Sequence, residues 1–139
     1  MNYLLDTCVI TELVNTKPEL RVVQWIRSQD EENLFLSVIT IGEIQKGISK
    51  LPDGRKKKQQ LQSWLNNEMQ ARFKDRILEI TIGTGNVWGQ VLGACENKGV
   101  TLAAIDSLIA SQGIFHKMTV VTRNISDMEP SGALLFNPW

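Results

Sequence analysis

The sequence predicts an α/β fold, a three-layer α/β/α sandwich around a mostly parallel central sheet of four to five strands. Short apolar segments of strand character alternate along the chain with longer segments of helical periodicity. The chain has 139 residues, 42% of them hydrophobic, which is enough for one well-packed core. No repeat, low-complexity tract or linker interrupts it. We therefore expect a single domain over residues 1–139.

The first half of the chain is expected to begin with a strand and a helix that Thr7 caps. Asn15 to Pro18 ends that helix. Apolar residues three and four positions apart indicate further helices, the last of them polar and rich in Gln and Lys. The expected strands are 3–5 and 33–37, and the expected helices are 7–15, 19–29, 41–51 and 55–73.

The second half continues the same alternation. Thr81 is the expected cap of a helix that ends near Gly99. The remaining elements are expected as strands 76–80, 119–122 and 133–136, a near-wholly apolar helix 102–116 and one helical turn at 126–129. In sheets of this kind, functional sites form beyond the carboxyl ends of the strands.

Composition excludes some classes of protein. Fifteen basic and fifteen acidic residues give zero net charge, which argues against attraction of nucleic acid by the whole surface but allows a local basic patch. No apolar run approaches the length of a membrane span, and no signal peptide is expected at the start. Cys8 and Cys95 match no metal or redox spacing, so we expect a reduced, cytoplasmic setting.

Three carboxylates lie inside apolar segments. Asp6 follows the first strand, Glu43 lies between Ile41 and Ile44, and Asp106 follows Ile105. Buried carboxylates are normally paired, because removing an ion from water is costly. Only Lys46 comes within three positions of any of them. If the three converge, a divalent cation is the economical counter-charge, and oxygen ligands favour Mg²⁺ or Mn²⁺.

Each acid also has a purely structural interpretation. Asp6 could simply cap a helix, and Glu43 could pair with a distant Arg. Asp106 is harder to explain in this way, since the helix interior expected around it disfavours Asp. His116 is the only histidine and is expected to be a helix-end residue, so a histidine general base is disfavoured.

Taken together, the motifs resemble those of the PIN-domain ribonucleases, and among them the VapC-type toxins of toxin–antitoxin pairs, in the FitB-like branch. They are LLDT at Asp6, IGEIQKGI with Glu43, AAIDSLIA with Asp106, and VTRN. The resemblance spans the whole chain. It implies a PIN-like domain that hydrolyses a structured RNA such as tRNA with Mg²⁺ or Mn²⁺. It also implies a homodimer that a cognate antitoxin inhibits by filling the acidic groove, with no membrane partner.

The resemblance assigns catalytic and metal-binding roles to Asp6, Glu43 and Asp106. Thr7 matches a small hydroxyl residue that is expected to orient the first carboxylate or a water molecule. The family's fourth acid is replaced here by Asn124, and the nearest carboxylate is Asp127. Either Asn124 supplies a neutral oxygen or Asp127 contacts the metal through water. Fewer negative charges favour one firmly held ion.

Contacts to RNA are expected from Arg123, beside the site, and from Arg55, Lys56 and Lys57, although a helix start of this kind is often just a solvated face. Two other functions stay open. One is a non-catalytic PIN-like module that binds RNA or a protein partner. The other is a Mg²⁺-dependent phosphatase, which usually needs a second Asp at the position that Cys8 occupies.

Overall fold

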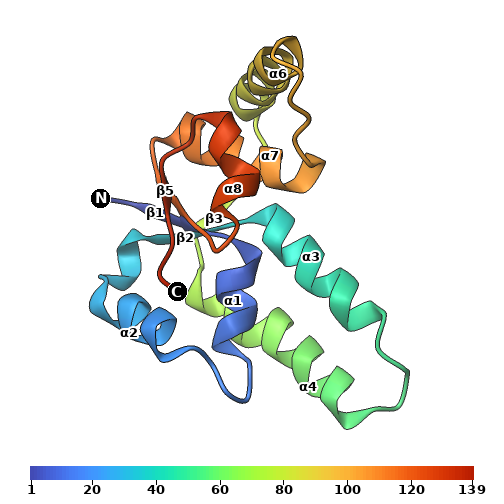
Figure 1. Cartoon of the computed structure of the whole chain (residues 1–139). Coiled ribbons are helices and arrows are strands. Elements are labelled where there is room, and N and C mark those ends of the chain that lie inside the picture. Colours follow the sequence, from blue (N-terminus) through green and yellow to red (C-terminus); the bar gives the residue numbers. More distant parts are fainter.

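Five short strands form one parallel sheet in the order β3-β2-β1-β4-β5 in the computed structural model, which describes residues 1–139 (Figure 1). Every pairing is parallel, and Leu5 of β1 lies opposite Val121 of β4, so the carboxyl ends of the central strands are level. The strands are β1 (Tyr3–Leu5), β2 (Leu34–Ser37), β3 (Ile77–Leu78), β4 (Thr119–Val121) and β5 (Leu135–Phe136).

Helices cover both faces of this sheet, which confirms the predicted three-layer sandwich. One face carries α1 (Thr7–Leu13), α2 (Leu20–Ser28), α3 (Val38–Ser49), α4 (Lys56–Ser63), the π-helical segment η2 (Trp64–Met69) and α5 (Gln70–Arg72). The other face carries α7 (Ala104–His116) and α8 (Ile125–Met128), with α6 (Ile82–Asn97) packed on α7. Short 3₁₀ turns are η1 (Glu31–Asn33) and η3 (Glu129–Ser131).

Alternation along the strands separates the core into two clusters. Leu5 and Val121 point into the larger cluster beneath α1, α2 and α3, whereas Leu4 and Val120 point into the smaller cluster beneath α7 and α8. All four side chains are fully buried. The sheet therefore fixes both helical layers relative to the same strand ends.

The helix starts differ from the predictions at three places. The helix that carries Glu43 begins at Val38 and not at residue 41, and Ser37 caps it. Asp6, and not Thr7, caps α1, because the Asp6 carboxylate accepts a hydrogen bond from the backbone N–H of Thr7. Thr81 caps α6 as expected. The helix that carries Asp106 begins at Ala104 and not at residue 102, so Asp106 lies in its first turn, where a carboxylate is favoured by the helix dipole.

The polar helix predicted at 55–73 is present as a continuous helical segment over residues 56–72, but its geometry changes along its length. It runs as α4, then as the π-helical η2, then as the single turn α5. Leu65, Met69 and Phe73 are buried along it, so core packing holds the segment in place despite its polar sequence. None of the helices combines the length and the apolar character that crossing a membrane requires.

The position of α7 depends on a close approach to the sheet. A Cβ atom built on Gly113 would come within 2.5 Å of Cγ2 of Val120 in β4, so only glycine fits there. This contact sets the height of α7 above the strands and brings its first turn, with Asp106, toward the carboxyl edge of the sheet.

Candidate active site

Asp6 is fixed at the end of the central strand β1. Its side chain is only 3% exposed, and each carboxylate oxygen accepts a hydrogen bond. The backbone N–H of Thr7 donates to Oδ1 at 2.8 Å, and the hydroxyl of Thr122 at the end of β4 donates to Oδ2 at 2.7 Å. Capping thus explains one oxygen of Asp6, and the other is oriented by a residue 116 positions away in the sequence.

Glu43 is oriented by Thr7. The Thr7 hydroxyl donates to Oε1 of Glu43 at 2.5 Å and lies 3.1 Å from the hydroxyl of the buried Thr40. The sequence had suggested that Thr7 orients the first carboxylate; the structure shows its backbone amide contacting Asp6 and its hydroxyl contacting Glu43. One residue therefore bridges the two acids.

Asp106 completes the group from the opposite helical layer. It is half-buried, and burial raises the pKa of its carboxyl group above the ordinary value. The negative charges of Asp6, Asp127 and Glu43 raise this pKa further. These electrostatic effects indicate that the four carboxylates share one region at the sheet edge.

None of these acids is neutralised by a basic side chain. All ion pairs of the structure involve Glu19, Glu31 or Asp53. The interpretation of Glu43 as the partner of a distant Arg is therefore wrong. Unpaired carboxylates whose negative charges raise the pKa of Asp106 have the donor chemistry of a site for a divalent cation.

The distances between the acidic side chains determine whether they could bind one cation directly or through water. No three Asp, Glu, His or Cys side chains lie close enough together to hold a metal ion as they are placed. Since Mg²⁺ keeps several of its water ligands, a cation at this site would be bound partly through water or after side-chain rotation.

Thr122 is a site residue that the sequence analysis missed. Its hydroxyl donates to Asp6, accepts from the backbone N–H of Asn124 at 2.9 Å, and lies 3.8 Å from the sulfur of Cys8. A hydroxyl residue at the carboxyl end of a strand was the available signal. Cys8 is not a nucleophile here: burial and then the charge of Asp6 raise the pKa of its thiol to about 11.

The fourth acidic position is occupied by two residues of different character. Asn124 precedes α8, and its side chain makes no capping hydrogen bond. Asp127 is exposed in the first turn of α8, and its charge reaches Asp106. Asp127 therefore supplies a fourth negative charge near Asp106, and Asn124 supplies none.

The predicted RNA-binding residues fall into two separate places. Arg123 is exposed beside Thr122, with its guanidinium 5.6 Å from the ring centroid of Trp139. Arg55, Lys56 and Lys57 lie at the start of α4, at the far end of α3 from the acids (Figure 1). Only Arg123 adjoins the site directly.

A groove of about 370 Å³ opens beside the acids. Its wall is largely apolar, with Glu43 at the site and Lys46 farther along α3; the remaining lining residues are Val38, Ile39, Gly42 and Ile105. The partly exposed Val38 and Ile105 give this groove the character of a docking place for a partly apolar segment.

The carboxyl edge of this parallel sheet carries acids that have no basic partner. The model of the PIN domain family matches residues 3–126, and the chain belongs to this family. It is 35% identical to toxin FitB of Neisseria gonorrhoeae over 98% of this chain and 97% of that one. It is 31% identical to VapC ribonuclease Y4jK of Sinorhizobium fredii, over 97% and 96% of the two chains.

The fold agrees with a solved relative of this group. The structure of FitAB bound to the IR36 DNA fragment superposes with a TM-score of 0.92 and 34% identity, covering 99% of this chain and 95% of that one. The expected relationship to VapC-type toxins of the FitB branch is thereby confirmed.

Proposed function

We propose that this protein is a Mg²⁺- or Mn²⁺-dependent endoribonuclease, one PIN-like domain over residues 1–139, that acts as the toxin of a type II toxin–antitoxin pair. The observation that carries the proposal is the group of four carboxylates at the carboxyl edge of the sheet, none of which has a basic partner. Membership of the PIN family, with a relative named as a VapC ribonuclease, supports RNA as the substrate.

The chain's own residues have distinct roles in this proposal. Asp6, Glu43 and Asp106 hold the cation, and Asp127 contributes charge through water. Thr122 and Thr7 orient Asp6 and Glu43, respectively, by donating a hydrogen bond to each carboxylate. When bound, the divalent cation supplies positive charge to the scissile phosphate and makes water more acidic.

No imidazole takes part in this chemistry. His116 is the last residue of α7, and Asp106 lies in the first turn, about 15 Å away along the helix axis. Burial lowers the pKa of His116, so it is neutral at physiological pH. Proton transfer at the site is therefore left to carboxylates and water.

The proposal includes a cognate antitoxin and a homodimer. FitB is named a toxin, and the FitAB structure supports a comparable partner for this chain. Unpaired carboxylates next to an apolar groove suit a protein segment that presents an arginine beside apolar side chains. Such a segment would neutralise the site and exclude RNA from it.

The other two functions have less support. A phosphatase is disfavoured by membership of the PIN family and by Cys8 at the position of the second Asp. A non-catalytic module would not need Asp6, Glu43 and Asp106 to be gathered without basic partners. A replacement at Asp106 separates these alternatives directly.

We expect the purified protein to cleave a structured RNA with Mg²⁺ or Mn²⁺, and Asp106→Asn to reduce the rate by at least about a hundredfold, as loss of one charge-stabilising group does. Gel analysis of end-labelled RNA measures the cleavage. Glu96→Gln, which removes an exposed acid far from the site, is the matched control. Cleavage in EDTA, or full activity of Asp106→Asn, would contradict the proposal.

A further inference from the structure

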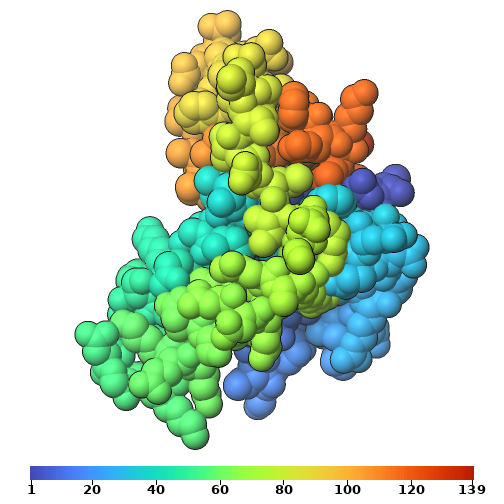
Figure 2. Space-filling model, turned by 180° about the vertical axis from the view of Figure 1, so that it is seen from behind, coloured from blue at the N-terminus to red at the C-terminus, as the bar shows by residue number.

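The positive charge of this protein is concentrated on one projecting part of the molecule. Residues 44–64, which we call the α3–α4 arm, carry six basic residues and the single acid Asp53, for a net charge of +5. Because the whole chain is neutral, all other residues together carry −5. The arm extends away from the sheet in both views (Figures 1 and 2).

Most basic residues of the arm form no ion pair within the protein. Lys58 is the exception, since it donates to the Asp53 carboxylate and to the backbone carbonyl of Leu51. The other five basic residues of the arm make no ion pair: Lys46, Lys50, Arg55, Lys56 and Lys57. All five are exposed.

The position of these charges is unfavourable for the isolated protein. Arg55, Lys56 and Lys57 lie at the N-terminal end of α4, where the helix dipole repels cations, and the first turn contains no acid. Asp53, the one acid of the arm, is paired with Lys58. An external polyanion would offset the repulsion felt by the other cations.

The two helices of the arm are joined to each other and to the core. The side-chain amides of Gln45 in α3 and Gln62 in α4 exchange two hydrogen bonds, of 2.9 and 2.8 Å. Ile48 of α3 and Leu65 of the following η2 are buried in the larger core cluster. Joining the two helices in this way limits their relative motion, which lowers the entropic cost of presenting their charges to a partner.

The basic residues form a path that begins at the acidic site. Lys46 lines the same groove as Glu43, and Lys50 follows one turn later on the same side of α3. Lys50 lies about 10 Å along the helix axis from Glu43, which corresponds to about three nucleotides of a stacked strand. The charges at the start of α4 continue the path beyond Lys50.

We infer that the α3–α4 arm binds the phosphate backbone of RNA at a distance from the scissile bond, through Lys46, Lys50, Arg55, Lys56 and Lys57. The inference rests on the proposed ribonuclease function. Binding to the arm would let a protein of zero net charge prefer long or folded RNA. Such an RNA contacts both the carboxylates and the tip of the arm, whereas a very short strand reaches only the carboxylates.

The test compares two sets of lysines with equal charge. One variant combines Lys50→Gln, Lys56→Gln and Lys57→Gln in the arm. The control combines Lys74→Gln, Lys98→Gln and Lys117→Gln, which are exposed and unpaired elsewhere. Binding of a hairpin RNA and of a short single strand is measured against salt concentration in EDTA, with Asp106→Asn present in all proteins.

We expect the arm variant to bind the hairpin about tenfold more weakly and to lose about two units of the salt slope, since each phosphate contact contributes about 0.7 to 0.9. The control variant and the short strand should show little change. Unchanged hairpin binding by the arm variant, or an equal loss in the control, would overturn the inference.

Cleavage distinguishes this inference from the proposed function. With Asp106 restored and Mg²⁺ present, the arm variant should cleave the hairpin with a raised KM and the short strand as the control does. Equal loss on both substrates would show that the arm acts on the site itself, which overturns the inference. Absence of cleavage by the unaltered protein would instead overturn the proposed function, while the binding measurement would still test the arm.

Discussion

At the scale of single residues, the acidic site conflicts with the stability of the fold. Asp106 lies at a helix start that favours a carboxylate, yet burial and three neighbouring negative charges raise its pKa. A raised pKa means that the ionised carboxyl group is less stable in the folded protein than in the unfolded chain. Folding therefore brings negative charges together at the site, and without a counter-charge this lowers the stability of the folded protein.

Replacing Asp106 by Asn should stabilise the metal-free protein at neutral pH while abolishing cleavage. Between the ordinary pKa of Asp and the raised pKa of Asp106, the folded state binds more protons, so the stability of the unaltered protein falls as pH rises through this window. At pH values above this window, ionisation of Asp106 lowers the stability of the folded protein by its full amount. Because Asp106 is only half-buried, we expect a gain below about 1 kcal/mol.

Urea unfolding in EDTA at a series of pH values measures this effect. The midpoint of Asp106→Asn should exceed that of the unaltered protein at neutral pH, and the two should converge as the pH falls below the window. Glu96→Gln serves again as an exposed control. A lower midpoint for Asp106→Asn at neutral pH would show that the carboxylate stabilises α7 through its dipole instead.

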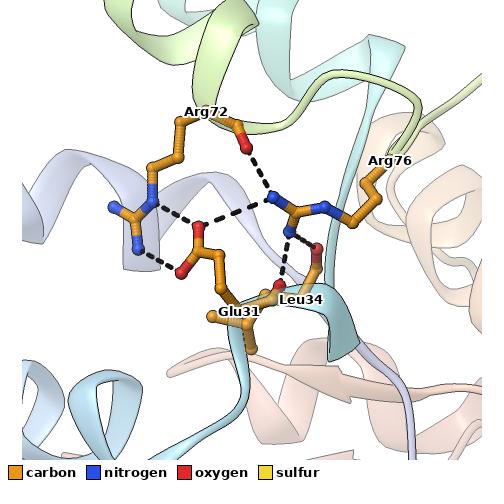
Figure 3. Close-up of polar contacts among 4 residues, drawn as sticks. All are labelled: Glu31, Leu34, Arg72 and Arg76. Atoms are coloured by element: carbon orange, nitrogen blue, oxygen red, sulfur yellow. Dashed lines mark hydrogen bonds and ion pairs between the residues drawn. The ribbon is translucent and has the colours of Figure 1, made fainter.

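At the scale of elements, an arginine cluster joins two segments that are distant in the sequence (Figure 3). Arg72 of α5 forms two hydrogen bonds with the carboxylate of Glu31 in η1, at 2.6 and 3.1 Å. Arg76 donates to the backbone carbonyls of Glu31, Leu34 and Arg72. Both guanidinium groups lie 5.1 Å from the ring centroid of Phe73. The cluster thereby ties β3 and α5 to the start of β2.

Arg76→Met should destabilise the protein by about 2 kcal/mol, because charge-assisted hydrogen bonds contribute about 1.5 to 3 kcal/mol and carbonyl acceptors are left without a donor. Its side chain is only 16% exposed, so water cannot fully replace it. Arg21→Met removes a surface ion pair with Glu19 and should cost less than about 1 kcal/mol. Thermal unfolding of both variants measures the difference, and equal losses would contradict the role of the cluster.

Local patterns in the sequence were sufficient for most elements but not for contacts of this kind. Apolar periodicity predicted the strands and most helices, and the apolar segments around Asp6, Glu43 and Asp106 identified the acids. The bond from Thr122 to Asp6 spans 116 positions, and that from Arg72 to Glu31 spans 41. No local spacing encodes such pairs. The π-helical segment η2, in which Leu65 and Met69 are buried, likewise has no local signal in a sequence that reads as one helix.

At the scale of the whole molecule, the site joins the two halves of the sandwich. Asp6 directly follows the central strand, Glu43 belongs to the helical layer over the larger core cluster, and Asp106 and Asp127 belong to the layer over the smaller one. A ligand that binds all of these groups in the folded state, and none of them together in the unfolded chain, stabilises the entire fold.

Divalent cations should therefore raise the melting temperature. At a concentration one hundred times the dissociation constant, the gain is about 2.7 kcal/mol, which corresponds to several degrees for a chain of this size. The melting temperature in MgCl₂ or MnCl₂ is compared with that in EDTA, with NaCl at matched ionic strength as the control. Asp106→Asn should lose most of the gain because it removes one negative charge from the shared region. An equal rise in this variant would place the binding of the cation elsewhere on the surface, and the carboxylate edge would then lose its role as the metal site.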